Sequence, residues 1–199
     1  TVCAEHLPHP PRPVFRASPS ARLLIVGQAP VRRVHETGIP WNDPSGDQLR
    51  LWLGMTREAF YDPSRIAIVP TGLCYPGTVK GSDLPPRPEC APLWHPQLRA
   101  AMPDIRLTLL IGAYAQAYYL GRRRGRTLAD TVLTWRDFAP DYLPLPQPSP
   151  RNSAIRSAWR GRSSTQTMIS CGWTPLAAAT ALTFSVSIGV APPSKGSCL

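Results

Sequence analysis

The fold is decided by residues 22–30, RLLIVGQAP, where an unbroken apolar run ends in a glycine. Two further runs have the same form, RIAIV at 65–69 and RLTLLIG at 106–112, and a weaker fourth, YLPL, spans 142–145. Strands buried on both faces of a parallel sheet are apolar without alternation, so these runs predict such a sheet. Pro144 has no amide proton, which places the fourth strand at an edge or ends it early.

Segments with a helical hydrophobic period separate these runs, at residues 47–53, 92–102 and 113–120. Ser45 is a suitable N-cap for the first, and glycines follow the first and third at Gly54 and Gly121. Strands that alternate with helices predict an α/β fold: a three-layer α/β/α domain around a short central parallel four-stranded sheet. Ligands bind beyond the carboxyl ends of such strands. We therefore expect the site in the loops at 28–44, 71–89 and 146–152.

Charge is unevenly distributed over the 199 residues, whose formal net charge is +10. All 12 acidic residues lie at or before Asp141, whereas the chain from Tyr142 onward carries five basic residues and no acidic one. This charge favours a polyanionic partner, either nucleic acid or an anionic membrane surface. The composition, 43% hydrophobic with 25 prolines, excludes an acidic solvating protein, a collagen-like repeat and a coiled coil.

Three regions follow from the composition. Residues 1–20 form a proline-rich N-terminal arm, residues 21–153 the α/β domain, and residues 154–199 an atypical tail, which we interpret as frame-shifted or disordered. The apolar stretch at 176–191 is too short and too interrupted to span a membrane. The chain opens at Thr1 with no apolar signal-peptide core, so we expect a cytoplasmic protein whose reading frame begins upstream.

Four motifs, in this order on an α/β pattern, carry a resemblance. They are GQAP at 27–30, TGIPWNDPSG at 37–46, the segment from CYPG to PPRPEC at 74–90, and LPQPSPRN at 145–152. Together they resemble the uracil-DNA glycosylase superfamily, most closely its bacterial iron–sulfur branches, families four and five. The resemblance covers about residues 3–152. It implies a DNA-repair hydrolase that flips uracil out of DNA and cleaves its N-glycosidic bond, acting as a nucleoid-associated monomer.

The resemblance also implies a base pocket. Trp41 stands where these enzymes stack an aromatic ring on the base, although a tryptophan buried in the core is the alternative. Gln28 and Ala29 would line the base and the reacting sugar carbon, and Thr71 stands where the family reads uracil. Ala29 replaces the Asp that orients water in related enzymes, and a glutamine is no general base near neutral pH.

Water activation is therefore assigned to a neighbouring turn. Asn42 is the catalytic candidate and Asp43 an equal one, with a turn role before Pro44 as the alternative for both. Gln147 is the third catalytic candidate. It replaces the family's histidine, and its amide would stabilise charge on the leaving base less strongly.

Contacts to DNA are expected from two basic regions. Ser149, Arg151 and Asn152 belong to the proline-braced motif that faces the duplex. A cluster at 122–126 contains four arginines, and a solvated helix end explains it as well as DNA contact does.

Five cysteines are present, and the resemblance assigns three of them, Cys3, Cys74 and Cys90, to a structural [4Fe–4S] cluster. The fourth ligand would be a cysteine just upstream of Thr1, with His6 as the alternative. Unrelated free cysteines are the other interpretation.

Two other readings of the chain remain open. One is a non-catalytic binder of damaged or single-stranded DNA, which Ala29 and Gln147 favour. The other is a chain that does not fold stably.

Overall fold

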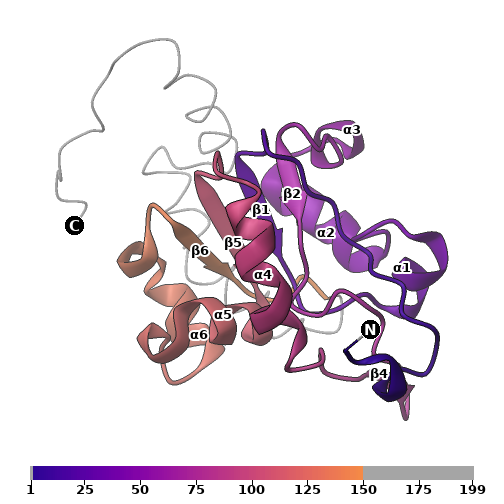
Figure 1. Ribbon diagram of the computed structural model, residues 1–199. Coiled ribbons are helices and arrows are strands. Elements are labelled where there is room, and N and C mark those ends of the chain that lie inside the picture. Colours follow the sequence, from indigo (N-terminus) through magenta and orange to yellow (C-terminus); the bar gives the residue numbers. More distant parts are fainter. Residues whose placement is uncertain (1, 150–199) are drawn as a thin grey trace, which may run out of the picture.

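The computed structural model describes residues 2–149, which form a parallel sheet between two layers of helices (Figure 1). The sheet has four strands in the order β2-β1-β5-β6, and every neighbouring pair is parallel. These strands are β1 (Leu23–Val26), β2 (Ile66–Ile68), β5 (Leu107–Ile111) and β6 (Tyr142–Leu145). The predicted fold class is confirmed. Pro144 lies in β6, which is an edge strand of this sheet, as expected for a residue without an amide proton.

The helices match the predicted segments and add others between them. The α-helices are α1 (Arg32–Thr37), α2 (Pro44–Leu53), α3 (Arg57–Phe60), α4 (Cys90–Ala100), α5 (Gly112–Leu120) and α6 (Leu128–Leu133). Three 3₁₀ turns span Ala4–His6, Gly121–Arg123 and Trp135–Phe138. The predicted loop at 28–44 contains α1, and the loop at 71–89 contains a small hairpin of β3 (Thr78–Val79) and β4 (Ser82–Asp83).

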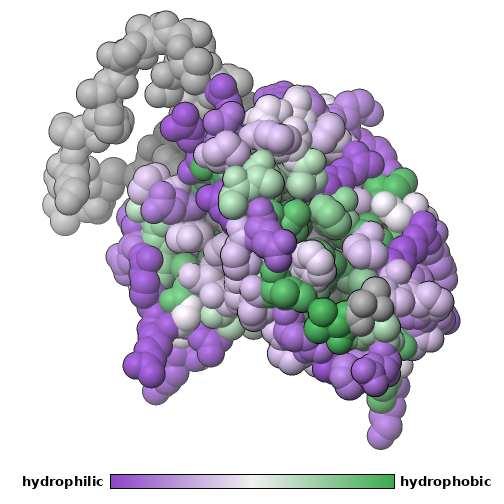
Figure 2. Space-filling model, in the orientation of Figure 1, coloured by the Kyte–Doolittle hydropathy of each residue, from purple (hydrophilic) through white to green (hydrophobic). Residues whose placement is uncertain are grey.

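Alternate residues of the strands divide the core between the two faces of the sheet. Leu23 and Ile25 of β1 pack with Leu49 and Leu53 of α2 on one face. Leu24 and Val26 lie on the other face, in a cluster that includes residues of α4 and α5. Because both faces are covered, the strands are apolar throughout, which explains why their sequences show no alternation. Hydrophilic residues cover most of the molecular face seen in Figure 2, with smaller hydrophobic areas between them.

Helix α2 begins earlier than predicted. Asp43, not Ser45, is its N-cap: the Asp43 Oδ1 accepts a hydrogen bond of 2.9 Å from the Gly46 amide. Pro44 occupies the first helical turn, where its missing amide proton costs nothing. Gly54 ends the helix in the left-handed conformation, as the sequence predicted.

The N-terminal arm packs on the domain. Arg16 exchanges two backbone hydrogen bonds of 2.8 Å with Ile68 of β2, and the Val14 amide donates to the Leu73 carbonyl. The Val14 side chain is buried. The region boundaries near residues 20 and 153 stay predictions, and the tail at 154–199 lies outside the described residues. Within residues 2–149, no helix has the length and apolarity needed to cross a bilayer.

Candidate active site

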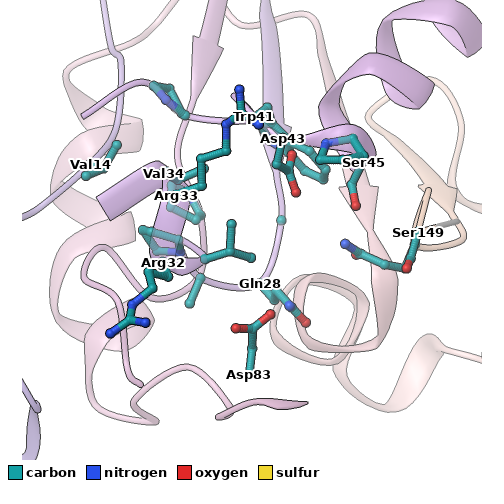
Figure 3. A pocket seen from close by; sticks show the side chains of 18 of the residues that line it. Val14, Gln28, Arg32, Arg33, Val34, Trp41, Asp43, Ser45, Asp83 and Ser149 are labelled. Atoms are coloured by element: carbon teal, nitrogen blue, oxygen red, sulfur yellow. The ribbon is translucent and has the colours of Figure 1, made fainter. Parts of the chain in front are cut away.

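A cavity of about 580 Å³ lies beyond the carboxyl ends of the strands (Figure 3). Gln28 and Asp83 lie on one side of it in this view, and Trp41, Asp43 and Ser45 on the other. Gln147 also lines the cavity. These side chains come from the turn after β1, the segment between α1 and α2, the β3–β4 hairpin and the turn after β6. Parallel strands end at one edge of a sheet, so turns far apart in sequence meet there.

The Trp41 indole lies over Gly27, the last residue of the apolar run that forms β1. A Cβ atom at Gly27 would lie 2.8 Å from the Trp41 Cζ2, so only glycine admits the ring here. The ring is partly buried against the core cluster and also lines the cavity. Trp41 therefore packs against the core, as the alternative expected, and also forms part of the cavity wall. Its stacking on a base stays a prediction.

Gln28 is held through its backbone by the next strand-end turn. The Thr71 hydroxyl points at the carbonyl oxygens of Gly27 and Gln28, at 3.1 and 2.6 Å, and the Gly72 amide donates to the Gln28 carbonyl at 2.8 Å. Thr71 is buried and is absent from the cavity wall among the described residues. Direct reading of the base by Thr71 stays a prediction. The geometry gives this side chain a different task, which is to position Gln28.

The two candidates for water activation differ in where their side chains lie. The Asn42 amide donates to the Thr37 hydroxyl at 3.5 Å, and its oxygen accepts from Arg57 at 3.1 Å. Both polar groups of Asn42 therefore have partners on the surface, and Asn42 is not among the residues that line the cavity. Asp43 lines it, and burial raises the pKa of its carboxyl while the hydrogen bond from Gly46 lowers it.

Gln147 lies against the first residue of α5. The φ of Gly112 is +80°, which favours glycine, and a Cβ there would lie 2.9 Å from the Gln147 Oε1, so the end of the Gln147 side chain would have to shift. Sequence reasoning missed the residue that joins these two strand ends. The buried Gln116 amide donates to the carbonyls of Leu110 and Leu145 at 3.3 and 3.0 Å. A glutamine on an otherwise apolar helix was the available signal.

The structure describes only some of the residues predicted to contact DNA. Ser149 lines the cavity, whereas Arg151 and Asn152 lie outside the described residues. The arginine cluster at 122–126 follows α5, which begins beside Gln147 and extends nine residues, roughly 13 Å, away from it. Arg123 stacks over Phe138 and donates to the Asp137 carbonyl. Arg32 and Arg33 of α1, in contrast, are exposed and line the cavity.

The three described cysteines come from the arm, the segment after β2 and the start of α4. Burial raises the pKa of the Cys74 thiol, the Arg12 backbone amide lowers it, and Cys3 and Cys90 raise it further. The Leu73 amide donates to the Cys90 Sγ at 3.3 Å. Hydrogen bonds to sulfur are among the features that tune iron–sulfur clusters. That these cysteines hold a cluster stays a prediction. Within residues 2–149, no group of three or more His, Cys, Asp or Glu side chains is arranged to hold a metal ion.

Comparison with known protein families agrees with this architecture. The model of the uracil DNA glycosylase superfamily matches residues 15–164, about three quarters of the chain. The chain therefore belongs to the uracil DNA glycosylase superfamily. Its general role is that of a glycosylase-like DNA-repair protein.

Proposed function

We propose that this protein removes uracil from DNA by hydrolysing the N-glycosidic bond of an extruded deoxyuridine. The observation that carries the proposal is that Gln28, Trp41, Asp43 and Gln147 line one cavity although they come from separate strand-end turns. The cavity volume of about 580 Å³ is in the range of sites that enclose a small ligand. A target base reaches such a pocket only after it leaves the duplex.

Trp41 supplies the stacking surface in this proposal. Aromatic stacking contributes about 1–3 kcal/mol per base, which offsets part of the few kcal/mol that extrusion costs. The amides of Gln28 and Gln147 are donors for the uracil carbonyls. Fixed donors near a leaving base stabilise the negative charge that grows on it as the glycosidic bond breaks.

Asp43, rather than Asn42, activates the attacking water in this mechanism. Its carboxylate lines the cavity, whereas the Asn42 amide is engaged by Thr37 and Arg57. Burial raises the pKa of Asp43, which makes its ionised form a better proton acceptor than an exposed aspartate. One Asp43 oxygen remains occupied by the Gly46 amide, so the carboxylate is fixed while it acts.

We propose in addition that Cys3, Cys74 and Cys90 hold a structural [4Fe–4S] cluster. When bound, it would tie the arm to the segment after β2 and take no part in the hydrolysis. Two observations support this assignment. Beyond the effect of burial, the thiols are close enough for one to raise the pKa of another, and the Leu73 amide donates a hydrogen bond to the Cys90 sulfur. Iron and sulfide content of the purified protein tests it: Cys90→Ser should lower both, and equal content in the variant would contradict the assignment.

The function is tested with a single-stranded and a duplex oligonucleotide that each carry one uracil. Alkali-sensitive abasic product is expected with the native chain, and Trp41→Ala should form it about 5- to 150-fold more slowly, the factor that the loss of stacking represents. Tight binding without product would instead support the non-catalytic DNA binder, which Ala29 and Gln147 favour because neither supplies the acid–base group found in relatives. Absence of both product and binding would exclude both functions.

A further inference from the structure

The turn that carries Trp41 is held from behind by two side chains that line no part of the cavity among the described residues. The Arg50 Nη1 donates to the Trp41 carbonyl at 3.3 Å. The Tyr61 hydroxyl donates to the Pro40 carbonyl at 2.8 Å. Arg50 and Tyr61 also contact each other, since the Arg50 Nη1 lies 3.3 Å from the Tyr61 hydroxyl oxygen. Two consecutive carbonyls are therefore bound by one connected pair.

Arg50 of α2 is only 7% exposed, which is unusual for a charged side chain. A buried charge destabilises a protein unless it is paired and hydrogen-bonded. Asp47 pairs with its Nη2, and the guanidinium lies 5.3 Å from the centre of the Phe60 ring. The other terminal nitrogen, Nη1, donates to the Trp41 carbonyl and to the Tyr61 hydroxyl, so part of the hydrogen bonding of this buried charge goes to the cavity turn.

The backbone of Trp41 requires such support. Its φ is +57°, in the left-handed region that bulky residues rarely adopt. Strained residues of this kind persist only where the surroundings determine their conformation. The Trp41 carbonyl is also closely covered by Gly46, because a Cβ there would lie 1.8 Å from its oxygen. The conformation therefore depends on contacts to that carbonyl and its neighbour.

The Tyr61 ring is itself fixed independently of its hydroxyl. Three arginines surround it, Arg16 at 5.0 Å, Arg57 at 5.1 Å and Arg50 at 5.6 Å from the ring centre. Arg16 also donates to the Tyr61 carbonyl at 3.0 Å. A phenylalanine at position 61 keeps the ring contacts and loses only the hydroxyl. This substitution therefore removes the bond to the Pro40 carbonyl and the bond from the Arg50 Nη1 together.

We propose that Arg50 and Tyr61 are positioning residues that hold the Trp41 ring in the orientation needed to stack on the extruded base. This inference rests on the proposed function, because stacking on an extruded base is what the orientation of the Trp41 ring would serve. Neither side chain touches the base. They act through the two carbonyls of the turn, and their removal is expected to weaken recognition of the base more than the stability of the fold.

The test compares Tyr61→Phe with Tyr118→Phe in the full chain. Tyr118 also donates to one backbone carbonyl, that of Ala91 at 3.2 Å, but it does so between α4 and α5 on the other face of the sheet. The readout is the ratio of affinities for DNA that carries 2′-fluoro-2′-deoxyuridine, a uracil nucleotide that resists hydrolysis, and DNA that carries a tetrahydrofuran abasic site, which offers no base to stack. Complete loss of stacking lowers affinity by about 5- to 150-fold. We expect Tyr61→Phe to lower the ratio about 3- to 10-fold and Tyr118→Phe to leave it unchanged.

A second readout does not depend on the function. In protein labelled with 5-fluorotryptophan, the Trp41 fluorine resonance, assigned with Trp41→Phe, should shift in Tyr61→Phe and in Arg50→Lys but not in Tyr118→Phe. An unshifted resonance overturns the positioning role whatever the DNA assays show. In a Trp41→Ala background, Tyr61→Phe should have no further effect on the affinity ratio.

The outcomes separate the two claims. If Trp41→Ala lowers the affinity ratio and Tyr61→Phe does not, the positioning role is wrong and the proposed function stands. If Trp41→Ala leaves the ratio unchanged, Trp41 is not the stacking surface, so the purpose assigned to Arg50 and Tyr61 fails, whereas abasic product still decides the proposed function. Equal losses in Tyr61→Phe and Tyr118→Phe would show a general effect of stability and would also overturn the inference.

Discussion

Asp43 combines two roles that a pair of substitutions can separate, because it caps α2 and also lines the cavity. Asparagine caps helices as well as aspartate does, so Asp43→Asn keeps the bond to the Gly46 amide and removes only the carboxylate. General-base catalysis contributes about 10²- to 10⁴-fold, so we expect Asp43→Asn to lower the single-turnover rate by at least about 100-fold. Its thermal midpoint should stay close to that of the native chain.

Asp43→Ala provides the comparison, since it loses the cap as well. Loss of an N-cap costs about 1 kcal/mol, which for a chain of this length lowers the midpoint by about 2–4 °C. The assay follows abasic product from a uracil oligonucleotide under single-turnover conditions, beside thermal unfolding of each variant. A native rate in Asp43→Asn would refute the role in water activation. A rate loss confined to Asp43→Ala would show that only the cap matters.

The pH dependence provides a further check on Asp43. Burial raises the pKa of its carboxyl, and the ionised form is the proton acceptor. The rate should therefore fall with decreasing pH through a pKa above the ordinary value for aspartate, and this limb should be absent in Asp43→Asn. The same shift means that the folded state binds this proton more tightly, so the contribution of Asp43 to stability decreases as pH rises from the ordinary pKa through the raised one.

Three other predictions concern neighbouring parts of the site. Gln147→His should raise the rate by about tenfold or more, because a histidine adds a cationic donor for the leaving base; an unchanged or lower rate counts against Gln147 as that donor. Arg33→Ser should make the negative slope of log affinity against log salt shallower by about 1, while Arg124→Ser, beyond the far end of α5, leaves it unchanged. Equal slopes in both variants would show that Arg33 contacts no phosphate. Gln116→Leu should lower the free energy of unfolding by about 1–3 kcal/mol, because the Leu110 and Leu145 carbonyls lose their shared donor; urea denaturation with native stability would contradict this.

Local sequence was sufficient for much of the fold because the relevant signals are local. The four apolar runs mark the strands, since burial on both faces leaves no place for polar residues in them. Pro144 predicts its own edge position through its missing amide proton. The helix N-cap was misplaced by two residues because Asp43 and Ser45 are both good caps, and only the bond to the Gly46 amide distinguishes them.

Tertiary structure decided what each side chain of the site does. The sequence alone determined a parallel α/β sheet, its strand-end motifs and the family they resemble, and it treated Asn42 and Asp43 as equal candidates. The structure directs Asn42 to Thr37 and Arg57 and Asp43 into the cavity, and it brings Arg50 and Tyr61 behind Trp41. The contacts of Arg57 with Asn42 and of Tyr61 with Pro40 join residues 15 and 21 positions apart, and their geometry depends on how the helices pack. Periodicity and propensity are properties of neighbours in sequence, so they contain no information about such contacts.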